Sequence, residues 1–423
     1  MYRKHYLFLC MMVILTTGLN YAKAQDTLYM NIQTVQSTFM KQNLDLMVAR
    51  FEIDKASAQI TQAQLLNNPE FEIIANAYNP EDRKIMDVSN KTGDYAFRLE
   101  QLFTLGGKRK KASRFAQTQY DYSQNSFSEF LRDLLFSLRS NFYTLHFLQE
   151  TYQKLNSQVE GLKNLTNSYY RLQEKQLVTL NDALRIKSLY FSLLSDITEI
   201  VNQMEDIQNE LRVLLNLPDK TFLIQQAETS NLPAFPAHFT LKELVDSARN
   251  NRPDLKMART NILMNEQAYL LEKSLAIPDL KVGAAYARRD AFVPKATMID
   301  IGLEIPLFNR NQGNIKAAKV GISQAKTEVG IKELRIETEI QSTYSKAMNA
   351  NKTLLEMDDT FFTSYETLLK NVRQNLEKQT ISLLDFVQFH ESYQESVLQF
   401  FKLKNEKMQA IEELNHSIGK YIF

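Results

Sequence analysis

One motif is written twice in this chain: residues 175–182 read KQLVTLND, and residues 378–385 read KQTISLLD. Each copy lies between two long segments in which apolar residues recur with a helical period. A short polar stretch between two such segments is typical of the tip of a helical hairpin. The sequence therefore predicts two helical hairpins with matching tips.

The repeat extends outward from these tips over most of the chain. Each half has an apolar-periodic stretch, then two short alternating stretches, then the long hairpin. The first apolar-periodic stretch predicts one helix from Met30 to Leu66, and the outgoing helix of the second hairpin is expected to run from Ile315 to about Gln379. Asn68-Pro69 in the first half matches Ile277-Pro278 in the second. An internal repeat of this kind means that both halves belong to one pseudo-symmetric fold. We expect a signal peptide at 1–24, a first repeat at 25–217, a linker at 218–239 and a second repeat at 240–423.

The predicted hairpins are too long for an ordinary globular core. No proline occurs between Lys108 and Gln176, and from Leu138 to Leu172 the apolar residues recur every three or four positions. A mean spacing below 3.6 residues implies a left-handed supercoil. At about 1.5 Å per residue, such a helix would be on the order of 100 Å long.

Short alternating stretches precede each hairpin. Ile299, Ile301 and Leu303 alternate with Asp300 and Gly302, and the first half has the same pattern around Phe97 and Leu99. The alternation predicts strands with one apolar and one polar face, each close to the length of a tilted membrane strand. Four strands cannot close a barrel within one chain. Either they lie on a protein surface, or several copies of the chain pool their strands.

The N-terminus has the features of a secretory signal. Arg3 and Lys4 precede an apolar run that extends to about Leu19, and Ala22-Lys23-Ala24 forms a small-x-small cleavage pattern. The single cysteine, Cys10, lies inside the apolar run, so the exported chain would contain no thiol. Because no later segment approaches the roughly 20 apolar residues of a membrane helix, we expect any membrane crossing to use strands.

Composition and motifs argue against an enzyme and against a nucleic-acid-binding protein. The formal net charge is +1, and the longest basic run is Lys108-Arg109-Lys110-Lys111, which is too small a footprint for nucleic acid. We interpret the charged residues as solvated helix faces. The sequence has no glycine-rich phosphate loop, no nucleophile motif and no pair of histidines with metal-ligand spacing. We therefore expect no catalytic residue, no cofactor and no metal site.

The strand-to-helix junctions carry the residues that indicate a family. Glycine allows the positive φ that is needed where an extended chain turns into a helix, and the basic residues that follow are interpreted as a solvated first turn. The junction residues are Gly106, Gly107, Lys108 and Arg109 in the first half, and Pro306, Asn309, Arg310, Asn311 and Gly313 in the second. With their flanking residues they resemble the junctions of the outer membrane efflux proteins, the TolC family. The resemblance is strongest to the CzcC type, which serves heavy-metal resistance-nodulation-division (RND) pumps.

The resemblance covers nearly the whole exported chain and implies a mixed α/β membrane protein. It implies a homotrimer in which each protomer gives four transmembrane strands to a twelve-stranded barrel and long coiled-coil hairpins to a periplasmic α-barrel. The implied function is a passive exit duct in the Gram-negative outer membrane, which receives substrates, metal cations by preference, from a periplasmic adaptor and an inner membrane RND transporter. The alternatives are a multidrug or type I secretion duct of the same fold, or a soluble periplasmic coiled-coil scaffold.

The same resemblance assigns roles to the hairpin tips. Asp385 and its counterpart Asp182 would line a constriction, where three copies of Asp385 would form an anionic ring. The other interpretation is a carboxylate at a helix N-terminus, stabilised by the helix dipole. Gln379 departs from relatives, which often carry glycine at that position. The residues expected to contact the adaptor are Gln176, Leu177, Val178, Thr179, Leu180, Gln379, Thr380, Ile381, Ser382 and Leu383.

Overall fold

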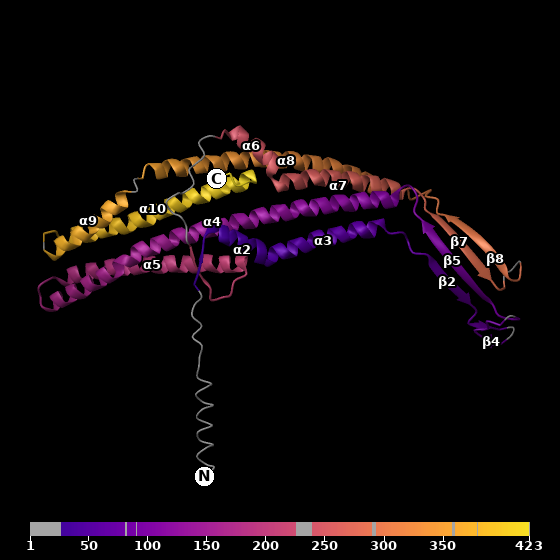
Figure 1. Cartoon of the computed structure of the whole chain (residues 1–423), viewed down its shortest axis with the longest axis horizontal. Coiled ribbons are helices and arrows are strands. Elements are labelled where there is room, and N and C mark those ends of the chain that lie inside the picture. Colours follow the sequence, from indigo (N-terminus) through magenta and orange to yellow (C-terminus); the bar gives the residue numbers. More distant parts are fainter. Residues whose placement is uncertain are drawn as a thin grey trace, which may run out of the picture.

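The computed structural model in Figure 1 is an elongated molecule, with long helices along most of its length and a small sheet at one end. The structure describes residues 27–80, 83–89, 91–225, 239–289, 293–357, 360–378 and 380–422. The predicted signal peptide and Gln379 lie outside these ranges. Among the described residues, no helix is both long enough and apolar enough to cross a membrane.

The order of elements in the first half returns in the second. In the first, α2 (Ile32–Gln42) and α3 (Leu44–Gln64) precede β2 (Glu70–Ala75), β5 (Tyr95–Phe103) and the hairpin of α4 (Lys108–Glu174) and α5 (Leu180–Leu215). In the second, α6 (Leu241–Asn251) and α7 (Pro253–Leu275) precede β7 (Leu280–Ala287), β8 (Ala296–Leu303) and a hairpin formed by α8 (Gln312–Leu355), α9 (Thr360–Glu377) and α10 (Leu383–Ile418). A small hairpin of β3 (Tyr78–Asn79) and β4 (Lys84–Ile85) lies between β2 and β5.

The segment before strand β2 contains two helices, where the sequence predicted one. Asn43 separates them: its Oδ1 accepts the N–H of Leu46 at 2.8 Å, and its Nδ2 donates to the carbonyl oxygen of Leu214 at 2.9 Å. An asparagine side chain at this position caps the second helix and satisfies backbone groups that would otherwise be unpaired. The same break recurs between α6 and α7, where Pro253 occupies the first turn of the new helix.

Two further differences concern the hairpins and the predicted linker. The outgoing helix of the second hairpin was expected to be continuous, but α8 ends at Leu355 and α9 begins at Thr360. Part of the predicted linker at 218–239 forms strand β6 (Phe222–Gln225), which pairs in parallel with β1 (Thr27–Met30). The buried side chain of Gln208 both accepts from the N–H of Leu223, at 2.8 Å, and donates to its carbonyl oxygen, at 3.0 Å. The linker is therefore attached to the helices at this point.

Helix α4 lies at the centre of the helical body. It contacts α3 and α7 toward the sheet and α5 and α10 toward the hairpin tips, while α8 packs on α7 and α10 (Figure 1). Its predicted apolar stripe is buried at Leu138, Phe142, Leu145, Leu155, Leu162 and Leu165. The helices therefore lie side by side along their length instead of surrounding a globular core.

The four long strands form one antiparallel sheet in the order β2-β5-β7-β8. The central pair, β5 with β7, joins the two repeats, with Leu99 opposite Ala284 and Phe103 opposite Leu280. Strands β2 and β8 form the two edges. The sheet and the hairpin tips lie at opposite ends of the molecule (Figure 1).

Candidate functional site

One face of the sheet is apolar and open to its surroundings. The rings of Phe71 and Phe97 stack on this face with their centroids 6.3 Å apart, and Ile299 and Ile301 are 78% and 73% exposed. An exposed apolar face of this kind marks a surface that contacts lipid or another protein. Besides the polar residues Gln101 and Thr297, the strand register places on it Phe71, Ile73, Ala75, Tyr95, Phe97, Leu99, Phe103, Leu280, Val282, Ala284, Tyr286, Ile299, Ile301 and Leu303.

The opposite face of the sheet is charged. Arg98 forms an ion pair with Glu72 across β5 and β2, and Lys281 forms one with Glu100 across β7 and β5, both at 3.3 Å. The register places Asp300 of β8 on the same face. Apolar and charged residues on opposite faces are the pattern of strands that separate lipid from a water-filled interior.

The first strand-to-helix junction is built from its two glycines and one partly buried ion pair. Gly106 and Gly107 have φ values of 65° and 70°, in the left-handed region that favours glycine. The Nζ atom of Lys108 lies 2.7 Å from the carboxylate of Asp279, and its side chain is 11% exposed. The expectation of a solvated basic turn is therefore wrong for Lys108, because this residue joins the first repeat to the second. Arg109 is exposed.

The second junction is organised by Asn311, which has a φ of 57° and precedes α8. Its Nδ2 donates to the carboxylate of Glu272 at 2.6 Å and to the carbonyl oxygen of the same residue at 2.9 Å. These bonds fix the start of α8 against the end of α7. Pro306, Asn309 and Arg310 form the turn before it, and Gly313 lies in the first turn of α8.

The two candidate constriction residues occupy equivalent capping positions. The amide of Asp182 donates to Oγ1 of Thr179 at 3.1 Å, and the amide of Asp385 donates to Oγ of Ser382 at the same distance. Each carboxylate also accepts the hydroxyl of its capping partner at 2.7 Å. Both aspartates therefore stabilise the start of a returning helix. Asp182 is half-buried, whereas Asp385 is exposed, so the carboxylate of Asp385 is accessible to a passing ion.

The two tips have the same backbone geometry on the side of the outgoing helix. The N–H of Leu177 donates to the carbonyl oxygen of Leu172, and the N–H of Thr380 donates to that of Asn375, both at 2.9 Å. Such bonds close the last turn of a helix. Both tips lie at the end farthest from the sheet (Figure 1). The described tip residues are Gln176, Leu177, Val178, Thr179, Leu180, Thr380, Ile381, Ser382 and Leu383.

The described residues include no group of three or more His, Cys, Asp or Glu side chains that could hold a metal ion. His146 and His390 are buried, and burial lowers the pKa of each to about 4. Nε2 of His416 lies 2.8 Å from Oδ1 of Asp133. These three imidazoles belong to the packing between helices.

Buried ion pairs between distant segments were not predicted from the sequence. Arg139 of α4 binds Glu412 of α10 at 2.6 Å, and the side chain of Glu412 is 1% exposed. The buried carboxylate of Asp254 binds Lys332 of α8 at 3.0 Å, in addition to its near neighbour Arg252 at 2.8 Å. The charges had been interpreted as solvated helix faces, which is wrong for these pairs. No spacing in the sequence indicates that Arg139 and Glu412 meet.

No family model matches the chain. The chain is 18% identical over 378 residues to the cobalt-zinc-cadmium resistance protein CzcC of Cupriavidus metallidurans, an alignment that covers 89% of the chain and 87% of CzcC. The outer membrane channel CmeC of Campylobacter jejuni has 16% identity and a TM-score of 0.73, over 93% of this chain and 87% of CmeC. The open-state outer membrane channel MtrE of Neisseria gonorrhoeae has 12% identity and a TM-score of 0.70, over 93% and 89%. The fold class predicted from the sequence is confirmed by these channels.

Proposed function

We propose that this chain, which resembles the TolC-type outer membrane efflux proteins in fold and sequence, is the exit duct of a tripartite efflux system. The observation that carries the proposal is the sheet with one exposed apolar face at the end of helical hairpins that are roughly 100 Å long. A sheet of this kind suits the outer membrane, and hairpins of this length suit a periplasmic tunnel. The chain itself would conduct passively.

A homotrimer would complete the structure at the edges of the sheet. Strands β2 and β8 are the two edges, and unpaired backbone groups of an edge strand are not tolerated in hydrocarbon. Three copies that pair β8 with β2 of the next protomer would form a closed barrel of twelve strands. The face with Ile299 and Ile301 would contact lipid, and the face with Arg98 and Lys281 would contact water.

The proposed protein partners would bind at the hairpin tips, at the end of the molecule opposite the sheet. The exposed tip residues, among them Leu177 and Leu180 at 68% and 55%, would contact a periplasmic adaptor. An RND transporter in the inner membrane would supply the free energy for export. We propose metal cations as the cargo, because the relative from Cupriavidus metallidurans is a cobalt-zinc-cadmium resistance protein and because the carboxylate of Asp385 is open to solvent.

The exposed apolar face argues against a soluble periplasmic scaffold. Phe71, Ile299 and Ile301 would each be in contact with water in such a protein, and a contiguous apolar patch of this kind promotes aggregation. A membrane environment removes that cost. The long hairpins alone would be compatible with either function.

Membrane fractionation tests the duct directly. The mature chain is expected in the outer membrane as a trimer that resists SDS at room temperature and dissociates on boiling. A host that lacks the gene should become more sensitive to cobalt, zinc or cadmium, and the intact gene should restore resistance. A stable monomer in buffer without detergent would contradict the proposal. If loss of the gene changes the sensitivity to drugs and leaves metal sensitivity unchanged, the proposed duct function is kept, and the proposed cargo changes from metal cations to drugs.

A further inference from the structure

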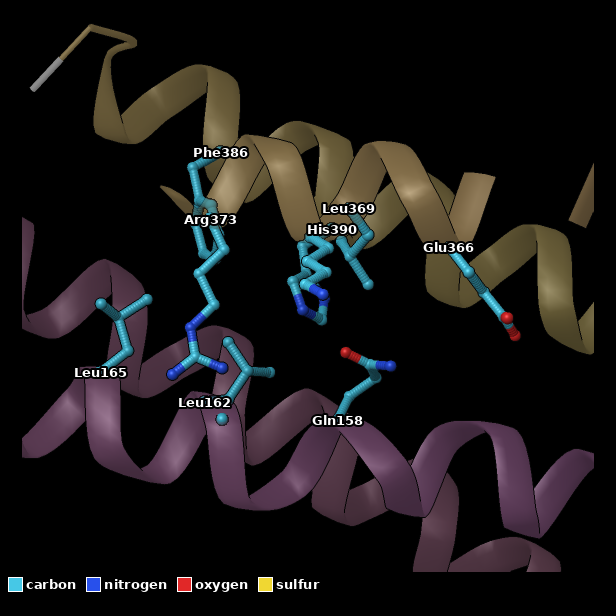
Figure 2. A pocket seen from close by; sticks show the side chains of 10 residues that line it. Gln158, Leu162, Leu165, Glu366, Leu369, Arg373, Phe386 and His390 are labelled. Carbon is cyan, nitrogen blue, oxygen red and sulfur yellow. The ribbon is translucent and has the colours of Figure 1, made fainter. Parts of the chain in front are cut away.

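The two hairpins line a cavity of about 200 Å³ near their tips, which is partly open to solvent (Figure 2). Helix α4 contributes Gln158 and Gly161, α9 contributes Lys370 and Arg373, and α10 contributes His390. A cavity of this size accommodates a small molecule as well as water. Its polar lining comes from both repeats, so any occupant would contact both hairpins.

Gly161 makes room for the guanidinium of Arg373. A Cβ atom at Gly161 would lie 2.8 Å from Nη1 of Arg373, and Figure 2 shows Arg373 extending from α9 toward α4. Glycine inside a helix costs roughly 0.5–1 kcal/mol relative to alanine, so this contact gives a physical reason for a glycine inside α4, toward its C-terminal end. A guanidinium has five N–H donors. Arg373 can therefore keep a contact within the protein and still donate to a ligand.

His390 presents a second polar group at the cavity. Its side chain is almost fully buried, and Nδ1 has no hydrogen-bond partner among the described residues. Burial and then the charge of Arg373 lower the pKa of His390 to about 4, so the ring is neutral at neutral pH. A neutral imidazole donates one hydrogen bond. Figure 2 shows the ring projecting toward Gln158, whose amide group is a further donor.

The carboxylate at the cavity is engaged elsewhere. Glu366 forms an ion pair with Lys154 at 2.6 Å, and in Figure 2 its carboxylate points away from Arg373. Lys370 and Arg373 are the cations among the lining residues, and both are exposed at the mouth of the cavity. The charges at the cavity therefore favour an anion over a cation.

We propose that this cavity binds a small tetrahedral oxyanion, such as inorganic phosphate or sulfate. Arg373 and Lys370 would supply charge-assisted hydrogen bonds, and Gln158 and His390 would supply neutral ones. The source would be free anion in the aqueous compartment, because Gly161 lies on the order of 80 Å along α4 from the sheet, beyond the reach of a lipid headgroup. A ligand that contacts both hairpins stabilises their association.

Isothermal titration of the purified, detergent-solubilised protein with sodium phosphate at constant ionic strength tests the site. We expect saturable binding with one phosphate per chain, which sulfate displaces and acetate displaces poorly. Arg373→Gln should weaken binding at least tenfold. Gly161→Ala should weaken it by a smaller factor, because the added methyl group displaces only the far end of the flexible Arg373 side chain. Gly161→Ala favours the helix and inserts a methyl group where the guanidinium lies, so loss of binding in this variant would not reflect unfolding.

The matched control is Gly330→Ala, another glycine-to-alanine change inside a long helix. A Cβ atom at Gly330 has no neighbour within 4 Å, so phosphate binding should be unchanged. The site assignment is overturned if the wild-type protein shows no saturable binding, or if both cavity variants bind as well as the wild type. If a water-soluble phospholipid binds more strongly than phosphate, the ligand of the site is a lipid headgroup and the proposal of a free anion is wrong. None of these outcomes depends on conduction, so failure of the anion site would not contradict the proposed duct function.

Discussion

Single residues at the two tips have the same local role and different exposure. Asp182 and Asp385 each bind the hydroxyl of the residue that caps their helix. This geometry establishes the capping interpretation of both carboxylates within one protomer. It does not compete with a ring of Asp385, because capping occupies one carboxylate oxygen and the other remains available. The half-buried position of Asp182 makes Asp385 the better candidate for contact with ions.

Replacing Asp385 with alanine is therefore expected to change conduction. Loss of three negative charges around one axis should reduce the preference for cations, or raise single-channel conductance if the ring also narrows the tunnel. Both quantities are measured in planar bilayers with a salt gradient. Asp182→Ala removes the equivalent cap in the first repeat and serves as the control for helix destabilisation. An unchanged conductance together with an unchanged reversal potential in Asp385→Ala would remove the ring assignment.

Among the elements, the edge strand β8 shows most clearly how alternation in the sequence places residues on two faces with different environments. Ile301 and Met298 belong to this one strand, but the register assigns them to opposite faces. Alternation with a period of two is a property of the extended backbone. The side that each face meets is decided by its chemistry, since lipid excludes the charged face and water disfavours the apolar one.

Two arginine substitutions on β8 separate these environments. Ile301→Arg should cost roughly 2–4 kcal/mol near the middle of a bilayer, whereas Met298→Arg on the charged face should cost little. The yield of heat-modifiable trimer in the outer membrane is the measurement, and Ile301→Arg should reduce it strongly. Equal yields of the two variants would mean that the apolar face does not contact lipid.

At the scale of the whole molecule, packing between helices controls the response to acid. His146 of α4 and His390 of α10 are both buried, and their pKa values are lowered to about 4 by burial first and by nearby cations second. The unfolded chain binds protons near pH 6.5, so it binds more protons than the folded protein between pH 6.5 and 4. Stability is therefore complete above pH 6.5 and falls as the pH drops through this range.

Thermal melting followed by circular dichroism at pH 7.5 and pH 5 measures this effect. The wild-type protein should melt at a lower temperature at pH 5, because each pH unit between the two pKa values is worth about 1.4 kcal/mol per histidine. His146→Leu removes one of the two groups and should make the difference smaller. A melting temperature that is the same at both pH values in the wild-type protein would show that neither histidine is linked to unfolding.

Buried ion pairs add a second acid-sensitive group. Burial alone would raise the pKa of Asp254, but hydrogen bonds and charges from Arg252 and Lys332 lower it below its usual range. A carboxylate with a lowered pKa stabilises the fold above its ordinary pKa, and this contribution is lost as the pH falls further. Its effect lies below the pH range of the histidines, so the two can be separated by measurement.

The sequence by itself determined the parts of this protein that depend on local period and composition. The duplication, the four strands, the apolar stripe of α4 and the position of the tips follow from patterns that a single segment carries. The resemblance that these patterns and the junctions support led to a fold that solved outer membrane channels share. The single helix expected before the first strand was wrong, because the break at Asn43 depends on a bond to Leu214 in another helix.

Only the tertiary structure decided the contacts between distant segments. The Lys108–Asp279 and Arg139–Glu412 pairs, the Gln208 contact with β6 and the cavity beside Gly161 all join residues whose spacing in the chain carries no signal. Their charges and amides look the same in the sequence as those of solvated residues. What distinguishes them is burial, which requires a partner for each polar group and is set by how the helices pack.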